Sequence, residues 1–144
     1  MLYIDKAQPG DIPYISSISL EAFSSGTPLS PLGRNEPRWY FDAASDGYLF
    51  KIIFDGVLVG GLVVFKTGSS TFQLERIFIL PSYQGLGIGR KSLEFIFKRF
   101  PEAKVWYVDA IPGLDGFSHF LKSAGFFESG FVSGSCSRYI RLIK

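Results

Sequence analysis

The sequence predicts a single domain over residues 1–144 of the α/β (α+β) class, with a mixed, mostly antiparallel sheet of six to seven strands and about four flanking helices. Three observations support this prediction. A chain of 144 residues with 47% hydrophobic and 19% charged residues is suited to one buried core. Three strand-like segments follow one another through tight turns between residues 48 and 80, which predicts an antiparallel meander. An amphipathic helix comes next, and it must return the chain to the sheet.

The N-terminal third is expected to begin with a strand at residues 3–7 and a helix of about a dozen residues. The turn Pro9-Gly10-Asp11 places Asp11 to cap that helix. Residues 24–37 contain three prolines, two glycines and three serines, so they are expected to form a loop. A short second helix is expected at residues 38–44.

The central and C-terminal segments complete the predicted sheet. The meander consists of strands at 48–54, 57–66 and 71–80, and Asp55-Gly56 is a hairpin turn signal between the first two. A helix at 90–100 follows, with its apolar side chains on one face. The remaining expected elements are a strand at 103–109, a turn at 111–116, a short helix at 117–124 ended by Gly125, and a hairpin of strands at 126–132 and 135–143 around Ser133-Gly134.

Composition excludes several classes of function. A net charge of +2, without a sizeable cluster of Lys or Arg, argues against a nucleic-acid partner. No apolar run approaches a membrane span and the N-terminus lacks a signal peptide's basic start, so we expect no membrane association and a cytoplasmic location. Cys136 and His119 are the only cysteine and histidine, which excludes an intrachain disulfide and a Cys/His metal site. We therefore expect no metal.

The most informative stretch is the glycine-rich loop after the third strand of the meander. Gly85, Gly87 and Gly89 stand at alternate positions between that strand and the following helix. The first-turn N–H groups of a helix lack intrahelical partners and the helix dipole adds positive charge, so this arrangement predicts an anion cradle. Glycine also lets backbone approach a phosphate without an intervening Cβ atom.

The spacing of the glycines narrows the choice of ligand. A dinucleotide-binding fingerprint would be G-x-G-x-x-G, and a P-loop would end in Gly-Lys-Ser/Thr, which Gly89-Arg90-Lys91 does not supply. The segment Gln84-Gly85-Leu86-Gly87-Ile88-Gly89 resembles instead the Q/R-x-x-G-x-G/A signature of the GCN5-related N-acetyltransferase (GNAT) family. The preceding run Ile77-Phe78-Ile79-Leu80-Pro81-Ser82-Tyr83 resembles that family's passage from strand to loop, and the predicted element order matches its fold over essentially the whole chain.

The resemblance implies an acetyl-CoA-dependent N-acetyltransferase. Acetyl-CoA would be the co-substrate, and a primary amine of a small molecule or peptide would attack the thioester directly, in a monomer or homodimer. The implied cofactor-binding positions are Ile77, Phe78 and Ile79, whose backbone would pair with pantetheine, and Gln84, Gly85, Leu86, Gly87, Ile88, Gly89 and Arg90, which would hold the pyrophosphate. Solvated surface charge is the alternative role for Arg90.

Glu75 is the candidate general base, because many family members carry a glutamate at this place on the strand. Amide formation needs a neutral amine, and therefore an acceptor for the ammonium proton. Regular alternation would put Glu75 and Ile77 on one face and Arg76 and Phe78 on the other, unless a bulge changes the phase. A structural ion pair with Arg76 or a surface lysine is the alternative role for Glu75.

One position departs from the family pattern. Family members commonly carry a tyrosine four residues before the helix-ending Gly-Phe, as the acid that protonates the thiolate, but here that residue is Leu121. Either CoA leaves as a thiolate that takes a proton from solvent, or another group substitutes. A third possibility is a non-catalytic acyl-CoA-binding module with a degenerate active site. A nucleotide-binding domain of different chemistry remains a separate hypothesis.

The acceptor side is less defined by the sequence. The resemblance places residues 34–40 beside the acceptor pocket, where Arg34 or Arg38 would steer an acidic acceptor and where Trp39 and Tyr40 are expected to serve packing. Asp109, at the end of its strand, either orients the amine or caps the following turn.

Overall fold

The computed structural model describes residues 1–24, 36–111, 115–134 and 136–143. The strands are β1 (Leu2–Lys6), β2 (Tyr48–Phe54), β3 (Val57–Lys66), β4 (Thr71–Ile79), β5 (Val105–Ala110), β6 (Phe127–Ser133) and β7 (Cys136–Leu142). The helices are α1 (Ile12–Ser24), α2 (Pro37–Asp46), α3 (Ile88–Arg99) and α4 (Asp115–Ser123), with single 3₁₀ turns at Pro9–Asp11 and Pro81–Tyr83. The predicted single α+β domain with a mixed sheet is confirmed.

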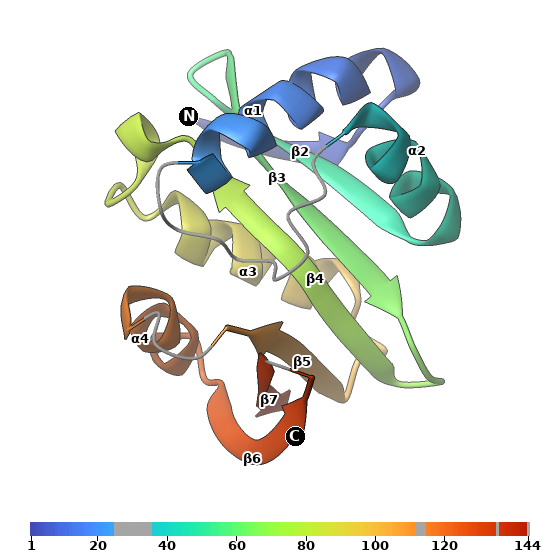
Figure 1. Ribbon diagram of the computed structural model, residues 1–144, viewed down its shortest axis with the longest axis vertical. Coiled ribbons are helices and arrows are strands. Elements are labelled where there is room, and N and C mark those ends of the chain that lie inside the picture. Colours follow the sequence, from blue (N-terminus) through green and yellow to red (C-terminus); the bar gives the residue numbers. More distant parts are fainter. Residues whose placement is uncertain (25–35, 112–114, 135, 144) are drawn as a thin grey trace.

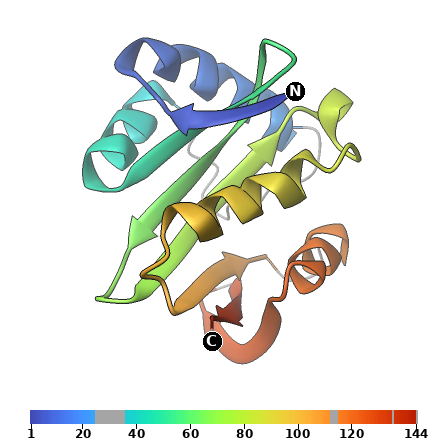
Figure 2. The same cartoon turned by 180° about the vertical axis from the view of Figure 1, so that it is seen from behind.

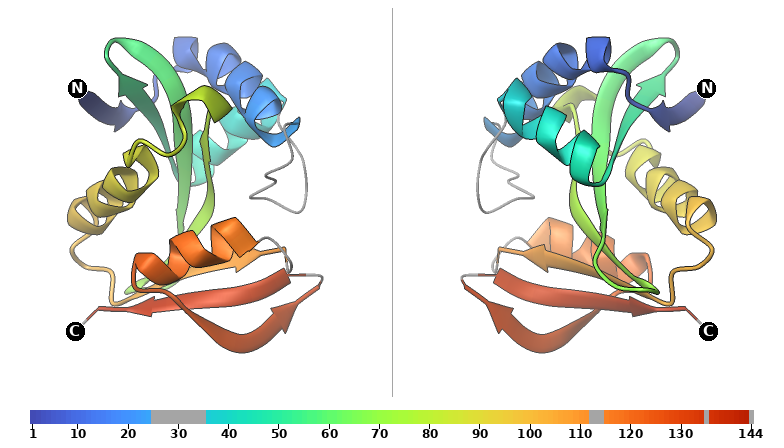
Figure 3. Two further views of the ribbon diagram at one scale, coloured as in Figure 1. Left: turned by 90° about the vertical axis from the view of Figure 1, so that its left-hand side faces the viewer. Right: turned by 90° about the vertical axis from the view of Figure 1, so that its right-hand side faces the viewer.

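All seven described strands form one sheet in the order β1-β2-β3-β4-β5-β7-β6. Every pairing is antiparallel except the one between β4 and β5. Helices α1 and α2 cover one face of the first half of the sheet and α3 covers the other (Figures 1 and 2). Helix α4 lies against β5, β7 and β6, and this second half of the sheet is turned strongly relative to the first (Figure 3).

Two hydrophobic clusters correspond to the two faces of the sheet. The larger one joins α3 and α4 to the sheet and includes Leu93, Ile96 and Leu121. The smaller one joins α1 and α2 to the sheet and includes Ile15, Tyr40 and Phe78. Because each cluster takes different residues from the same strands, the cluster to which a strand residue belongs shows which face it lies on.

Several predicted boundaries were wrong by one or two residues, which is usual at element ends. Helix α3 begins at Ile88 rather than at residue 90, because Gly87 adopts a left-handed conformation as the N-cap and the Ile88 side chain is buried. Helix α4 begins two residues earlier than predicted, and β5 begins at Val105 rather than at residue 103. The expected loop at 24–37 lies largely outside the described residues, as do residues 112–114 of the expected turn at 111–116 and Ser135 at the start of the last predicted strand. The last two residues of that expected turn, 115 and 116, belong to α4.

Candidate functional site

The site begins where β4 and β5 part. These two parallel strands pair at only three positions, the last of them Gln73 with Tyr107, while β4 continues to pair with β3 as far as Ile79. The part of β4 beyond Gln73 therefore presents to the β5 side a backbone edge without a strand partner among the described residues. Such an edge can take an extended ligand as an additional strand. The three predicted positions 77–79 lie on this edge.

The side chains of residues 77–79 face different surroundings. Ile77 is buried against the α3 side, Phe78 is buried against α1 and α2, and Ile79 is half-buried. Their side chains are used for packing, so only their backbone atoms are available for a ligand on the β5 side.

The glycine loop leads directly from this edge to the N-terminus of α3. Gly85 and Gly87 have φ values of +80° and +81°, and nothing lies within 4 Å of a Cβ atom built on either residue. Gly87 provides no side-chain cap for α3, so the first-turn N–H groups of the helix remain available to an anion. Gly89 differs, because it lies within α3, where a Cβ atom would stand 3.2 Å from the Phe120 ring. The third glycine is explained by the close packing of α4.

The other predicted residues of the loop contribute in different ways. The Gln84 side chain donates a hydrogen bond from Nε2 to the Ile79 carbonyl oxygen at 3.0 Å, which ties the loop to the end of β4. Leu86 is exposed, whereas the Ile88 side chain is buried in the core. Gln84 and Ile88 therefore fix the course of the loop around the exposed amides.

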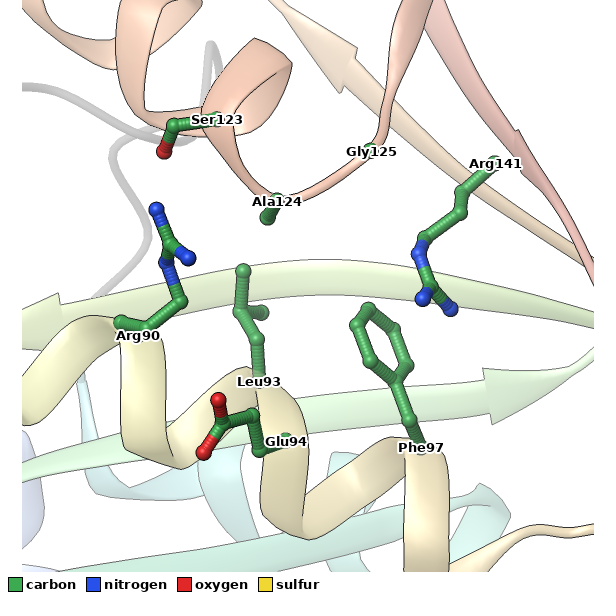
Figure 4. A pocket seen from close by; sticks show the side chains of 8 residues that line it. All are labelled: Arg90, Leu93, Glu94, Phe97, Ser123, Ala124, Gly125 and Arg141. Carbon is green, nitrogen blue, oxygen red and sulfur yellow. The ribbon is translucent and has the colours of Figure 1, made fainter.

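Arg90 lies in the first turn of α3 and lines a groove between α3 and α4 of about 340 Å³. The other lining residues are Leu93, Glu94, Phe97, Ser123, Ala124, Gly125 and Arg141. Figure 4 shows the Arg90 side chain directed toward Ser123 of α4, and Arg141 directed toward Phe97. The Arg90 side chain thus extends from the first turn of α3 into this groove, toward α4.

Glu75 lies in a β-bulge at the point where β4 leaves β5. Val63 of β3 pairs with Arg76 and Val64 pairs with Leu74, so Glu75 is an extra residue in β4. The bulge changes the phase of the alternation, because Leu74 and Ile77 both belong to the α3 side, whereas Arg76 contacts side chains of α2. Regular alternation from Glu75 to Ile77, which would put these two residues on one face, is therefore wrong.

The environment of Glu75 favours its protonated form. Burial raises the pKa of this carboxyl, and the negative charge of Asp109 raises the pKa further, while the positive charge of Arg76 opposes both effects. One carboxylate oxygen accepts a hydrogen bond of 3.1 Å from the Gln73 side chain. A half-buried carboxylate whose pKa lies above its usual range is better suited to accept a proton near neutral pH.

Arg76 is a buried cation that the sequence did not single out as functional. Its side chain is only 1% exposed, and its guanidinium carbon lies 3.7 Å from the centroid of the Trp39 ring. Its Nη1 donates a hydrogen bond of 3.2 Å to the Tyr40 hydroxyl. Trp39 and Tyr40 thus pack as expected, and they hold a positive charge beside Glu75.

Asp109 and Arg138 form an ion pair across β5 and β7. Nε and Nη2 of Arg138 donate hydrogen bonds of 2.8 Å and 3.0 Å to the two carboxylate oxygens of Asp109. This contact raises the pKa of Arg138. The sequence offered no signal for Arg138, because the pairing depends on the register between two strands that are far apart in the chain.

Helix α4 carries no tyrosine at the family position. Leu121 is fully buried in the cluster beneath α4, whereas His119 is exposed. The hydroxyl groups of Ser118 and Tyr139 lie 2.9 Å apart, so they share a hydrogen bond between α4 and β7. Arg34 lies outside the described residues, and Arg38 is exposed on α2.

The described residues offer neither a membrane-spanning helix nor a metal-binding cluster. None of the described helices is long and apolar enough to cross a membrane. Within the described ranges, no group of three or more His, Cys, Asp or Glu side chains is arranged to hold a metal ion.

The fold places the open edge of β4 next to the glycine loop before α3, and comparison with known proteins identifies the family. The model of the acetyltransferase (GNAT) family matches residues 13–131, so the chain belongs to this family. No curated protein matches the sequence significantly.

Solved structures match the chain over nearly its full length. An acetyltransferase of the GNAT family from Staphylococcus aureus Mu50 superposes with a TM-score of 0.82 at 18% identity, covering 100% of both chains. The PaiA N-acetyltransferase from Thermoplasma acidophilum, in complex with coenzyme A, gives a TM-score of 0.81 at 16% identity over 99% of both chains. A GNAT family acetyltransferase from Elizabethkingia anophelis with acetyl-CoA bound gives 0.74 at 15% identity, over 99% of this chain and 98% of that one. At these identities the likeness establishes the fold.

Proposed function

We propose that this protein is an acetyl-CoA-dependent N-acetyltransferase that acetylates a primary amine, with Glu75 as the general base. Family membership supports acetyl transfer. The observation that carries the proposal is the position of Glu75, a half-buried carboxyl with a raised pKa at the point where the β4 edge becomes open. A proton acceptor at Glu75 would lie beside the edge that is proposed to hold the acyl arm of the co-substrate.

The residues around this edge fit acetyl-CoA. Gly85 and Gly87 leave the space that a Cβ atom would fill, and no side chain at the N-cap covers the first-turn amides of α3. These amides and Arg90 would bind the pyrophosphate, and the backbone of residues 77–79 would pair with the pantetheine amides. Relatives whose structures contain coenzyme A or acetyl-CoA share this fold.

In the proposed reaction, Glu75 accepts a proton from the ammonium group of the acceptor, directly or through water. The neutral amine nitrogen then attacks the thioester carbonyl carbon, so that a C–N bond forms and the C–S bond breaks. CoA leaves as a thiolate and takes its proton from solvent, because buried Leu121 supplies none. The second amine proton passes to solvent as the amide forms, and Glu75 releases its own proton to solvent before the next cycle. All atoms are accounted for without a metal or a covalent enzyme intermediate.

The test is thiol release from acetyl-CoA in the presence of a panel of primary amines. Glu75→Gln keeps the shape of the side chain but cannot accept a proton at neutral pH, so we expect the rate to fall by about 10²–10⁴-fold with nearly unchanged CoA affinity. Glu102→Gln removes an exposed carboxylate in a turn and is the matched control, for which we expect the wild-type rate. A Glu75→Gln variant with the wild-type rate would rule out the base assignment.

A non-catalytic acyl-CoA-binding module is the second candidate, and one observation favours it. The family's proton donor is replaced by Leu121, whose side chain is fully buried rather than directed to an open site. Both candidates predict CoA binding, so calorimetry cannot separate them. Tight binding of acetyl-CoA without turnover of any amine would favour the binding module.

A further inference from the structure

The surface beside Glu75 carries a cluster that the acetyl-transfer chemistry itself does not use. This cluster, the polar shelf, consists of Tyr107 and Asp109 of β5, Arg138 of β7 and Phe131 of β6. The neighbouring residues Trp106, Val108 and Tyr139 belong to the cluster beneath α3 and α4, so the alternating residues of the shelf lie on the opposite face. In the right-hand view of Figure 3, α4 lies behind β5, β7 and β6, and no described helix covers this face.

Glu75 lies next to the shelf. Gln73, which donates a hydrogen bond to Glu75, pairs in register with Tyr107 of the shelf. The charge of Asp109 also reaches Glu75, because it contributes to the raised pKa of that carboxyl. Asp109 in turn faces Arg138 on the next strand. Three charged side chains therefore follow one another across neighbouring strands, namely Glu75 of β4, Asp109 of β5 and Arg138 of β7.

Arg138 is held rigidly while part of it remains accessible. Its guanidinium carbon lies 4.2 Å from the centroid of the Tyr107 ring and 4.7 Å from that of the Phe131 ring. Both contacts with Asp109 use the side of the guanidinium formed by Nε and Nη2. The Arg138 side chain is nevertheless 28% exposed. Two aromatic contacts and a bidentate ion pair thus fix one guanidinium plane at an open surface.

The remaining donors of Arg138 are suited to a second anion. A guanidinium carries five N–H donors, and Asp109 takes one from Nε and one from Nη2. Nη1 of Arg138 makes no hydrogen bond with any residue that the structure describes. The edge formed by Nη1 and Nη2 therefore keeps two parallel N–H groups, which match the two oxygens of a carboxylate.

We propose that the acceptor is an amine that also carries a carboxylate, that Arg138 binds the carboxylate through its Nη1/Nη2 edge, and that the amine is thereby directed to Glu75. This inference rests on the proposed acetyl transfer and names its class of substrate. Asp109 acts as a positioning residue, because its bidentate ion pair fixes the orientation of Arg138. The shelf selects against an acceptor with a second ammonium group, since Arg138 would repel it.

The experiment compares acceptors that have the same chain length and differ at one end. Each set contains an ω-amino acid, the n-alkylamine of equal length and the corresponding α,ω-diamine. The chains range over roughly two to six carbons, on the order of magnitude of the span from Arg138 to Glu75. We expect kcat/KM for the best ω-amino acid to exceed that for its alkylamine by about 10–100-fold, the usual effect of hydrogen bonds to charged groups. The diamine is expected to be the poorest member.

Three variants assign the preference to Arg138. Arg138→Gln should reduce the ratio of ω-amino acid to alkylamine close to one, mainly through KM for the amino acid. Arg138→Lys keeps the charge but loses the two-pronged geometry, so it should retain only part of the ratio. Arg99→Gln is the matched control, because Arg99 lies in the last turn of α3 and contacts the rings of Tyr48 and Phe100. We expect its ratio to equal that of the wild type, and thermal melts verify that each variant folds.

Binding to CoA-saturated protein separates failure of this inference from failure of the proposed function. Calorimetry should show that Arg138→Gln weakens binding of the ω-amino acid and leaves binding of the alkylamine unchanged, even if no amine is acetylated. Turnover of alkylamines or diamines at least as fast as of amino acids would overturn the substrate class while supporting acetyl transfer. Equal binding of the ω-amino acid to wild type and to Arg138→Gln would overturn the role of Arg138.

Discussion

Replacing Gly87 by alanine separates the conformational role of this glycine from its role in binding. Gly87 has a φ of +81° and no atom within 4 Å of the position that a Cβ atom would take, so alanine meets no steric clash inside the free protein. The cost to the fold is conformational, because a residue with a Cβ atom in the left-handed region is less stable by about 1–2 kcal/mol. A domain of this size should then melt about 2–4 °C lower for each kcal/mol lost.

Gly56 provides an internal control for this strain. It has a φ of +80° in the hairpin turn between β2 and β3, and a Cβ atom there also has no neighbour within 4 Å. Gly56→Ala should therefore lower the melting temperature by a similar amount. The two variants differ only in whether the new methyl group stands in front of the α3 N-terminus.

The assay is calorimetric titration of CoA into wild type, Gly87→Ala and Gly56→Ala. Loss of one hydrogen bond between a backbone amide and a phosphate costs about 1.5–3 kcal/mol, so we expect Gly87→Ala to weaken CoA binding by about tenfold or more. Gly56→Ala should bind like the wild type. Equal CoA affinity in all three proteins, despite the expected loss of stability, would refute the anion cradle.

Two further predictions concern the site. Because the pKa of Glu75 is raised in the folded protein, the folded state holds this proton more tightly than the unfolded state, and stability declines as pH rises from the usual carboxyl pKa through the raised one. Glu75→Gln should therefore be more stable than wild type at neutral pH, and this difference in stability should shrink at acid pH. A constant difference in urea unfolding at several pH values would contradict this prediction. Leu121 is fully buried, so Leu121→Tyr should lose about 1–3 kcal/mol of stability through overpacking, without a gain in kcat. Unchanged stability together with faster thiol release would instead show that the phenol reaches the leaving sulfur.

Local patterns predicted most of the elements because each pattern reflects a local requirement. Alternating β-branched and aromatic residues indicated the three strands of the meander, and Asp55-Gly56 was correctly placed at their first turn. The apolar face of α3 was visible from the spacing of its residues, with an error of two residues at its start. That error arose because Gly87 was interpreted only as loop, whereas its left-handed backbone also serves as the helix N-cap.

The order of the elements, the glycine loop and the family resemblance could be predicted from the sequence, because they depend on residues that are neighbours in the chain. Which side chains meet at the site depends instead on contacts between distant parts of the chain. The bulge at Glu75 changes the phase of the strand alternation, and it follows from the register of β4 against β3. The pairing of Asp109 with Arg138 follows from the register of β5 against β7. Register depends on packing summed over whole strands, so no short stretch of sequence contains it.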